Sequence, residues 1–446
     1  MATAVDNRPR DIIKVAAENY TSAEFARREK EHLWPKVWQV ACREEQIPNT
    51  GDYIVYDIAD DTIIVTRARD GGIKAFFNVC PHRGRRIMEG CGHAVNFRCG
   101  YHNWTFGLDG KNVAVQDRED WVGTLDSENL NLVEVRTGTW GGFVFINMDP
   151  DCESLETFLG VIPEYLDPFE LGNMRFRWSL ELSIDCNWKV ALEAFMEAYH
   201  VAATHAQLLD TQGEDRTSSF AHGKHAHFGY WGAEYFIGEP SPRLKKQRPK
   251  DVRPGVVDFF RQMEETFGAI FTDRDYEAAK QIMEHIPADA DPMTAFGAAI
   301  EFGRQAAIAD GCGYPEGLTY EALAKAGTGW HIFPNCQTLP YFDGAVWYRA
   351  RPDGDNPDKC IFNIWSLKRY APGKEPNVEH EKHTDLTGKS FGLIVDQDVA
   401  NMKEVQKGLK SRGFAYARPN PLQEVAIANF HRTLEQYVLG QARSGS

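Results

Sequence analysis

The sequence predicts an α+β protein, with an N-terminal all-β domain over residues 40–150 and a larger α+β domain over residues 151–446. In the first part, short runs of β-branched and aromatic residues alternate with turns rich in Asp and Gly. In the second part, helical patterns come first and strands follow, unlike the regular alternation of a parallel α/β sheet. The 446 residues are enough for about two to four domains of ordinary size.

The composition indicates an ordinary globular chain. Hydrophobic residues make up 43% and charged residues 25% of the sequence, which excludes a disordered protein. Lys and Arg number 49 against 64 Asp and Glu, so the net charge is −15, which argues against binding to nucleic acid or an anionic membrane. No run reaches the ~20 apolar residues that span a bilayer. Because no apolar signal core follows Met1, we expect a cytoplasmic protein.

The elements can be taken in chain order. Residues 1–39 predict a helical segment in which Ser22 caps a helix through Phe25. The strands expected next lie at residues 53–56, 62–66, 73–77, 103–108 and 142–147. In the second domain we expect helical stretches at 187–209 and 255–326, a basic loop at 240–256, strands at 330–333, 345–351 and 360–370, and a helix at 392–409.

The first chemical signal lies in two short turns. Cys80-Pro-His82 is followed after sixteen residues by Cys99-Gly-Tyr-His102. The set fits either a Cys2His2 zinc site or a Rieske [2Fe–2S] cluster, in which two thiolates bind one iron and two imidazoles bind the other. Zinc fingers usually pair cysteine with cysteine, whereas each turn here supplies one cysteine and one histidine. We therefore predict a Rieske cluster, with zinc as the alternative.

The other cysteines do not extend this motif. Nine cysteines are too sparse in a chain of this length for a disulfide scaffold. Cys91 and His93 lie between the two turns but do not fit the ligand spacing, so we expect them in a surface loop.

The second signal is the pair His200 and His205. On an ideal helix, side chains five residues apart are offset by roughly 140°, so both reach one site only if the helix breaks near residues 203–204. Alone, such a pair is more typical of structural histidines. Beside a one-electron cluster, it indicates a 2-His-1-carboxylate Fe(II) site. Asp396 and Asp398 are both candidates for the carboxylate.

Together, these motifs resemble the alpha (large) subunit of Rieske non-haem iron oxygenases of the aromatic ring-hydroxylating type. The resemblance covers nearly the whole chain, from the two Cys/His turns through Asn187-Trp-Lys and the E-x-x-H-x4-H motif to the late Asp398 helix. It implies a Rieske domain followed by a helix-grip (START-like) catalytic domain, with an antiparallel sheet and covering helices.

The resemblance also implies roles for the matching residues. It favours Asp398 over Asp396 as the third ligand of the mononuclear iron. The ligands that it implies are Cys80 and Cys99 for one cluster iron, His82 and His102 for the other, and His200, His205 and Asp398 for a mononuclear Fe(II).

Glu197 stands where the family places an acidic residue that bridges the two metal sites across the interfaces of a homotrimer. In that position it would orient a histidine of each site. The chain departs from the family here, because several members have aspartate at this position and many have asparagine where Ala194 stands.

The implied activity is that of an oxygenase that takes electrons through the cluster from a ferredoxin or a flavin-dependent reductase. It would use O2 to hydroxylate an aromatic or related cyclic substrate, by ring cis-dihydroxylation or monohydroxylation. Oxidative O- or N-demethylation stays open, as does a small beta subunit. The alternative of another class is a Rieske electron carrier, which would leave His200 and His205 unused.

Further residues are weaker candidates. Lys245 and Lys246 of the basic loop are candidates for docking an acidic electron donor. His222, His225 and His227 are expected to face solvent. Candidates for the substrate pocket, because they flank the iron ligands, are Phe195, Met196, Ala202, Leu208 and Leu209.

Overall fold

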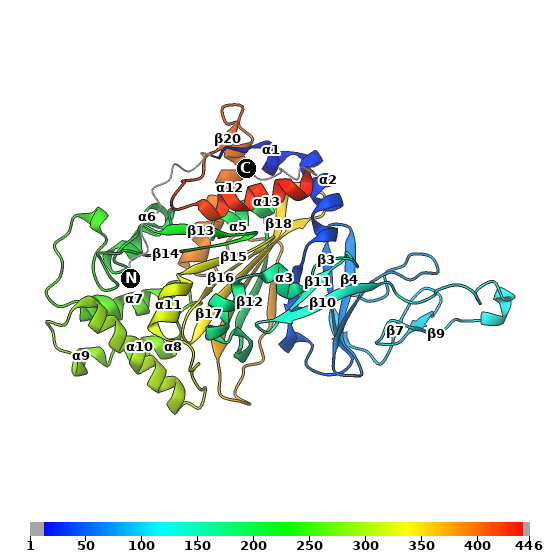
Figure 1. The fold of residues 1–446 in the computed structure, drawn as a ribbon, viewed down its shortest axis with the longest axis horizontal. Coiled ribbons are helices and arrows are strands. Elements are labelled where there is room, and N and C mark those ends of the chain that lie inside the picture. The colour runs from blue at the N-terminus through cyan, green and yellow to red at the C-terminus, as the bar shows by residue number, and fades with distance from the viewer. Residues whose placement is uncertain (1–12, 440–446) are drawn as a thin grey trace. The chain divides into compact units, whose positions relative to one another are not determined.

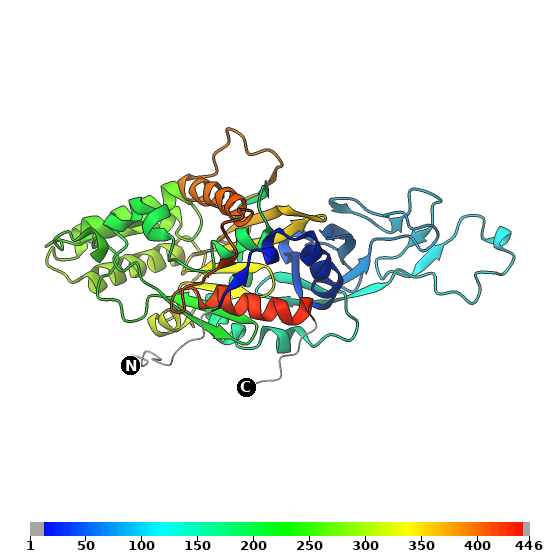
Figure 2. The same cartoon turned by 90° about the horizontal axis from the view of Figure 1, so that it is seen from above.

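The computed structural model describes residues 13–439 and divides into two compact units. One unit is Arg27–Phe158, and the other contains the chain up to Ala26 and from Leu159 onward. Figure 1 and Figure 2 show the ribbon from two directions, coloured along the chain. Residues 1–12 of the predicted N-terminal helical segment lie outside the described residues.

The chain from residue 13 to 39 contains the predicted helix. Ser22 Oγ accepts a hydrogen bond from the backbone N–H of Phe25 at 3.3 Å, which is the capping bond that the sequence predicts. The regular elements here are β1 (Val15–Ala16), which pairs with β20 (Tyr416–Ala417), and the helices α1 (Glu18–Thr21) and α2 (Ala23–His32).

The Arg27–Phe158 unit is built on antiparallel strands. Residues 53–56, 62–66, 73–77 and 142–147 form strands as predicted, whereas the strand expected at 103–108 is only two residues long. In spatial order the seven-stranded sheet is β2 (Gln39–Arg43), β11 (Phe143–Asn147), β10 (Glu134–Trp140), β5 (Ile73–Phe77), β4 (Asp61–Arg67), β3 (Asp52–Ile58) and β6 (Cys91–His93). A second, three-stranded sheet consists of β7 (Phe97–Arg98), β8 (Thr105–Phe106) and β9 (Asn112–Ala114).

The other unit, which contains the chain from Leu159 onward, is organised around an eight-stranded sheet. Neighbouring strands are antiparallel, except that the last strand runs parallel to its neighbour. The strands predicted at 330–333, 345–351 and 360–370 lie within it. In spatial order they are β13 (Ser218–His222), β14 (His225–Gly229), β15 (Gly329–Ile332), β16 (Cys336–Pro340), β17 (Gly344–Asp353), β18 (Asn356–Arg369), β12 (Met174–Ile184) and β19 (His380–His383).

Helices cover this sheet, as the predicted fold class requires. α5 (Trp188–Glu193) packs on β17 and β18, α13 (Val425–Val438) packs on β13 and β14, and α12 (Leu393–Leu409) packs on α5 (Figure 1). The helices predicted over 255–326 form a group of their own beside the sheet (Figure 2). They are α7 (Arg253–Thr266), α8 (Asp273–Ala279), α9 (Ile282–His285), α10 (Pro292–Ala309) and α11 (Tyr320–Ala326); two short helices, α3 (Leu155–Leu159) and α4 (Ile162–Leu166), precede the sheet.

The stretch at 187–209 is helical only in parts, with the expected break near residues 203–204 and an earlier break that the pattern does not predict. α5 ends at Glu193, and the chain re-enters a helix only at α6 (Val201–Thr204), followed by a 3-10 turn at Ala206–Asp210. His200 and His205 therefore flank a single helical turn, with His205 outside helical geometry at φ −114° and ψ 46°. This arrangement removes the angular offset of a continuous helix. Among residues 13–439, no helix is long and apolar enough to cross a membrane.

Candidate metal centres

The two Cys/His turns have the same backbone design. In the first, the N–H of Cys80 donates to the carbonyl of Arg85 and the N–H of Gly84 donates to the carbonyl of Cys80, both at 2.9 Å. In the second, the N–H of Cys99 donates to the carbonyl of Trp104 at 2.8 Å, and the N–H of Asn103 donates back to Cys99 at 3.0 Å. The fourth residue after each cysteine has a positive φ, +74° for glycine and +60° for asparagine. Those are the residue types that adopt this conformation most readily.

These turns bring like ligands together. Cys80 and Cys99 are buried in the hydrophobic core of their unit. Burial raises the pKa of the Cys80 thiol, and the neighbouring Cys99 acts in the same direction. The rings of His82 and His102 lie with their centroids 4.6 Å apart, and Nδ1 of His102 is buried with no hydrogen-bond partner among the described residues.

Sulfur beside sulfur and imidazole beside imidazole is the arrangement that a two-iron Rieske cluster needs. A single tetrahedral zinc would instead gather all four donor atoms, each about 3–4 Å from the next. The structure instead pairs Cys80 with Cys99 and His82 with His102. The residues therefore fit a [2Fe–2S] cluster better than the zinc alternative.

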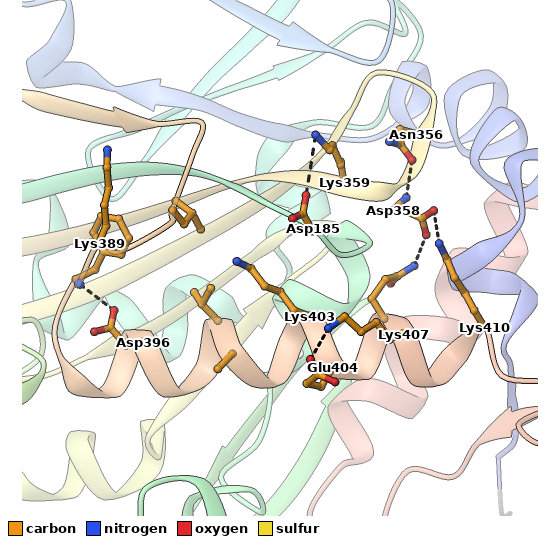
Figure 3. A pocket seen from close by; sticks show the side chains of 15 residues that line it. Asp185, Asn356, Asp358, Lys359, Lys389, Asp396, Lys403, Glu404, Lys407 and Lys410 are labelled. Carbon is orange, nitrogen blue, oxygen red and sulfur yellow. Dashed lines mark hydrogen bonds and ion pairs between the residues drawn. The ribbon is translucent and has the colours of Figure 1, made fainter.

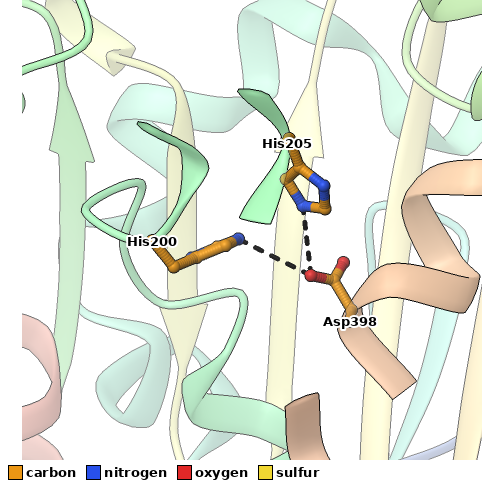
Figure 4. A group of neighbouring side chains, drawn as sticks. All are labelled: His200, His205 and Asp398. Carbon is orange, nitrogen blue, oxygen red and sulfur yellow. Dashed lines mark ion pairs between the residues drawn. The ribbon is translucent and has the colours of Figure 1, made fainter. Parts of the chain in front are cut away.

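The second centre joins two distant parts of the chain. His200, His205 and Asp398 have their donor atoms within 4.8 Å of one another (Figure 4). Asp398 Oδ1 lies 3.1 Å from Nε2 of His205 and 3.7 Å from Nε2 of His200. Two ligands at right angles on metal bonds of about 2.1 Å lie about 3 Å apart, which matches the contact between Asp398 and His205, whereas the contact with His200 is longer. The three residues supply the ligand types of a 2-His-1-carboxylate Fe(II) site.

Hydrogen bonds between helices fix the position of Asp398. Asn187 caps α5 by accepting the N–H of Lys189 at 3.1 Å, and its own N–H donates to Oε1 of Gln406 on α12 at 3.0 Å. Further along α12, Nδ2 of Asn401 donates to Oγ1 of Thr204 on α6 at 2.9 Å. The Asn-Trp-Lys motif thus ties α5 to the helix that carries Asp398, and Asn401 ties that helix to α6.

Glu197 holds the second nitrogen of His200. Its Oε1 lies 2.6 Å from Nδ1 of His200, and its Oε2 accepts the backbone N–H of His200 at 3.0 Å. Burial opposes the charged form of His200, but the hydrogen bond and the charge of Glu197 and then the charge of Asp398 raise its pKa. Burial, with the charges of Glu197 and Glu193, raises the pKa of Glu424 to about 7. A protonatable carboxyl group therefore lies near Glu197.

Asp396 does not join the histidines. Its side chain accepts hydrogen bonds from Ser390 at 2.5 Å and from the N–H of Phe391 at 2.8 Å. It lines a cavity of about 740 Å³ on the opposite side of α12, together with Lys403 and several other charged residues (Figure 3).

None of the five predicted pocket residues lines that cavity. Met196, Leu208 and Leu209 are buried, and Ala202 is half-buried. Phe195 stacks on Tyr348 with ring centroids 3.9 Å apart and on Phe362 at 5.5 Å.

Two residues near the iron site were not predicted. Tyr348 of β17 is buried close enough to Asp398 that burial and this charge raise its pKa. Gln397 accepts a hydrogen bond from Nδ1 of His205, at 2.8 Å. Its place directly before Asp398 was the signal that could have revealed it, whereas Tyr348 lies on a distant strand and had none.

Two predictions about other histidines are wrong. His225 and His227 were expected to face solvent, but both are buried in β14, where hydrophobic strand neighbours surround them. Nδ1 of His227 lies 2.8 Å from Nε2 of the half-buried His222, and burial followed by His222 lowers the pKa of His227 to about 3. Cys91 and His93 are exposed as expected, but in the short edge strand β6 rather than in a loop.

Comparison with known families decides the relationship. Residues 171–440 match the ring hydroxylating alpha subunit (catalytic domain), and residues 37–126 match the Rieske [2Fe-2S] domain. The chain belongs to the ring-hydroxylating alpha subunit family. This membership implies a [2Fe–2S] cluster and a mononuclear iron, which the two centres fit. The predicted α+β class and the predicted family are thereby confirmed.

Individual relatives span different shares of the chain. Biphenyl 2,3-dioxygenase subunit alpha of Rhodococcus jostii (strain RHA1) is 31% identical over 90% of this chain and 78% of its own length. The carnitine monooxygenase oxygenase subunit of Escherichia coli (strain K12) is 33% identical, but over only 53% of this chain and 63% of its own length.

Solved structures share the fold. A quaternary ammonium Rieske monooxygenase in complex with L-carnitine has a TM-score of 0.64 at 19% identity, over 97% of this chain and 99% of its own. Naphthalene 1,2-dioxygenase from Rhodococcus sp., bound to indole, has a TM-score of 0.62 at 20% identity, over 96% and 95%.

Proposed function

We propose that this protein is the oxygenase component of a Rieske system that hydroxylates an aromatic or related cyclic organic substrate. The observation that carries the proposal is that one chain holds both a Cys2His2 pair of turns and the His200, His205 and Asp398 triad. An electron carrier would need only the first of these. In this proposal residues 40–150 form the cluster domain and residues 151–446 form the catalytic domain.

The chain's own side chains would set up the reaction. The mononuclear iron would supply O2 binding and reduction at the positions that the triad leaves open. Phe195 stacks with Tyr348 and Phe362, and this cluster of three rings would provide a rigid aromatic surface close in sequence to His200 and help to exclude water. Leu208 and Leu209 would add apolar surface, which suits a cyclic hydrocarbon body.

We propose that Glu197 links the two metal centres between subunits of a homotrimer. This proposal is supported by two contacts between Glu197 and His200. One carboxylate oxygen of Glu197 contacts Nδ1 of the ring, and the other accepts the backbone N–H. Tyr199, next to the iron ligand, is 48% exposed, so this face of the catalytic unit is accessible to a partner chain. The carboxylate would orient His200 and offset a change in the charge of this histidine during electron transfer.

The electron donor would be a ferredoxin or a flavin-dependent reductase, in a cytoplasmic setting, which fits the absence of any disulfide among the cysteines of residues 13–439. The basic loop is a weaker docking candidate than its sequence indicates, because Lys246 forms an ion pair with Asp210, and Arg248 lies 3.4 Å from Glu239. Reversing the charges of Lys245 and Lys246 should slow reduction by the donor and flatten its salt dependence. Unchanged kinetics at low salt would leave the loop without a docking role.

A second candidate reaction is oxidative demethylation or hydroxylation of a charged aliphatic substrate. It is favoured by the 33% identity to the carnitine monooxygenase oxygenase subunit over 241 residues. Both candidate reactions use the same triad, and the difference lies in which substrate carbon is held near the iron.

The test is single turnover with the complete protein. About three irons per chain and a Rieske spectrum are expected, two from the cluster and one from the triad. The protein is reduced anaerobically and mixed with O2 and with biphenyl, naphthalene or carnitine, and products are identified by mass spectrometry. A hydroxylated ring supports the first candidate, and a product of carnitine alone supports the second. Two irons per chain with no oxygenated product would contradict both and leave an electron carrier.

A further inference from the structure

Two neighbouring residues of α12 contact the two nitrogens of the His205 imidazole. Successive residues of a helix point about 100° apart, so Gln397 and Asp398 can contact one ring from two sides. Asp398 Oδ1 lies 3.1 Å from Nε2 of His205, and Gln397 Oε1 lies 2.8 Å from its Nδ1. His205 is 3% exposed, so solvent does not compete for either nitrogen.

A second amide holds Gln397 in place. Gln207, two residues after His205, donates its Nε2–H to Oε1 of Gln397 at 3.0 Å and accepts from Nε2 of Gln397 at 3.3 Å. This reciprocal pair joins α12 to the 3-10 turn that follows α6. It fixes the plane of the Gln397 amide and turns one of its two ends toward the histidine.

The orientation of this amide pair is coupled to the tautomer of His205. With Oε1 toward the ring, Nδ1 carries the proton and Nε2 keeps its lone pair for a metal. If both amides were rotated, the NH2 of Gln397 would face Nδ1 and the proton would move to Nε2, where it blocks coordination. Only the orientation seen in the structure is compatible with His205 as an Nε2 ligand.

The two iron histidines are therefore held by different chemistry. Nδ1 of His200 meets the carboxylate of Glu197 at 2.6 Å, whereas Nδ1 of His205 meets a neutral amide at 2.8 Å. A hydrogen bond to a charged acceptor is stronger and makes the imidazole a better electron donor to a metal. The neutral amide orients His205 without adding a further negative charge to a site that already contains two carboxylates.

We propose that Gln397, held by Gln207, is the positioning residue that orients His205 so that its Nε2 faces the iron. The proposal rests on the proposed function only in that the triad binds Fe(II). Its consequence is an asymmetric site. His200 is held by the charged carboxylate of Glu197, whereas His205 is held by the neutral amide of Gln397.

The test measures Fe(II) affinity and spectra in the full-length protein that contains its cluster. Gln397→Met keeps the length of the side chain but removes the acceptor, and it should weaken Fe(II) binding by about 10–100-fold. Gln397→Glu restores an acceptor oxygen, so affinity should recover. The visible spectrum of the Co(II)-substituted site should nevertheless shift, because a carboxylate then faces Nδ1. Gln207→Met should give an intermediate loss that does not add to that of Gln397→Met.

The matched control is Gln305→Met, the same substitution on α10, where the amide donates to Glu301 and contacts no histidine. Its Fe(II) affinity should stay close to that of the unmodified protein, and the Rieske absorption should be the same in every variant. An equal loss in Gln305→Met, or normal affinity in Gln397→Met, overturns the proposal. His205→Ala distinguishes failure of the proposed iron site from failure of the proposed role of Gln397. If His205→Ala binds Fe(II) normally, the triad is not the iron site. If His205→Ala loses Fe(II) while Gln397→Met binds it normally, only the role of Gln397 is rejected.

Discussion

The two metal centres gather their ligands over very different lengths of chain. The cluster ligands all lie between Cys80 and His102, on two turns with the same hydrogen-bond pattern. The iron ligands lie on α6 and α12, and His205 and Asp398 meet only through helix contacts. A local site needs its own turns and the core beneath them, whereas a distributed site needs the whole catalytic unit to fold correctly.

The largest expected effect is the loss of the distributed site alone. His205→Ala should remove about one iron per chain and abolish product formation, because two ligands hold a metal much less firmly than three. The Rieske absorption should remain, because the cluster turns are independent of α6. Iron analysis and visible spectra measure both quantities in one sample, and retention of all iron would show that His205 is not a ligand.

The reciprocal change should affect only the local site. Cys99→Ser removes a buried sulfur ligand and should eliminate the Rieske spectrum. Fe(II) added to this variant should still bind at the triad, which iron titration measures. If the triad lost its affinity as well, the two centres would be coupled in folding, and the contrast between local and distributed sites would fail.

A subtler change tests the link between the centres. Glu197→Gln keeps a side chain of the same shape next to His200 but removes the charge that raises the pKa of this histidine. Both metal centres should remain, while product formation from a pre-reduced sample should slow by at least about tenfold, as for other changes next to a metal ligand. Rapid-quench single turnover measures this rate, and a normal rate would exclude the bridging role.

The smallest expected effect lies away from both metals, in the helical group. Oγ1 of Thr272 lies 3.0 Å from Oδ2 of Asp275 and 2.9 Å from Oδ2 of Asp343. One hydroxyl has one hydrogen, so one of the two carboxyl groups must carry a proton to complete both contacts. Burial and the charge of Asp343 raise the pKa of Asp275 to about 7, whereas Arg274 lies 2.5 Å from Asp343 and favours its ionised form. Asp275 therefore holds the proton.

The sign of the pH effect follows from this raised pKa. Between about pH 4 and pH 7 the folded protein keeps a proton that the unfolded chain has released, so this stabilisation is lost as pH rises toward 7. Asp275→Asn, which is neutral at every pH, should gain stability relative to the unmodified protein as pH rises, by at most about 1.4 kcal/mol per pH unit. Urea unfolding across this range measures the difference.

A matched control for this change is available in the same helical group. Hydrogen bonds from Thr294 lower the pKa of the exposed Asp291, so Asp291→Asn should not show this upward trend. Neither variant should change the iron content. A flat difference for Asp275→Asn would show that the two carboxyl groups do not share a proton.

The sequence was most informative where the chemistry is local. Cys80, His82, Cys99 and His102 were predicted from spacing, because each turn is completed within about five residues. His200 and His205 were also evident, although the break between residues 194 and 200 was not expected, since Ala194, Met196 and Ala198 are all compatible with a helix.

Where the site depends on remote contacts, the pattern was less informative. Asp396 and Asp398 could be separated only by resemblance, because both occupy the same helix two residues apart. His227 was misjudged because it is covered by Trp330 and Tyr165 of distant elements, with its ring stacked 4.6 Å from Trp330. His225 was misjudged because its Nδ1 accepts the backbone N–H of the distant Phe333. Gln397 was missed although it directly precedes Asp398, because an amide acquires its role only from the ring that it contacts.

The sequence by itself determined the class of the fold, the cluster turns and the residue types that bind iron, because these follow from local spacing and ligand chemistry. The tertiary structure decided which carboxylate faces the histidines, which nitrogen of each histidine is free, and what holds the other nitrogen. Those choices depend on how α12 packs against α5 and α6, and packing between segments nearly 200 residues apart is a property of the whole folded unit.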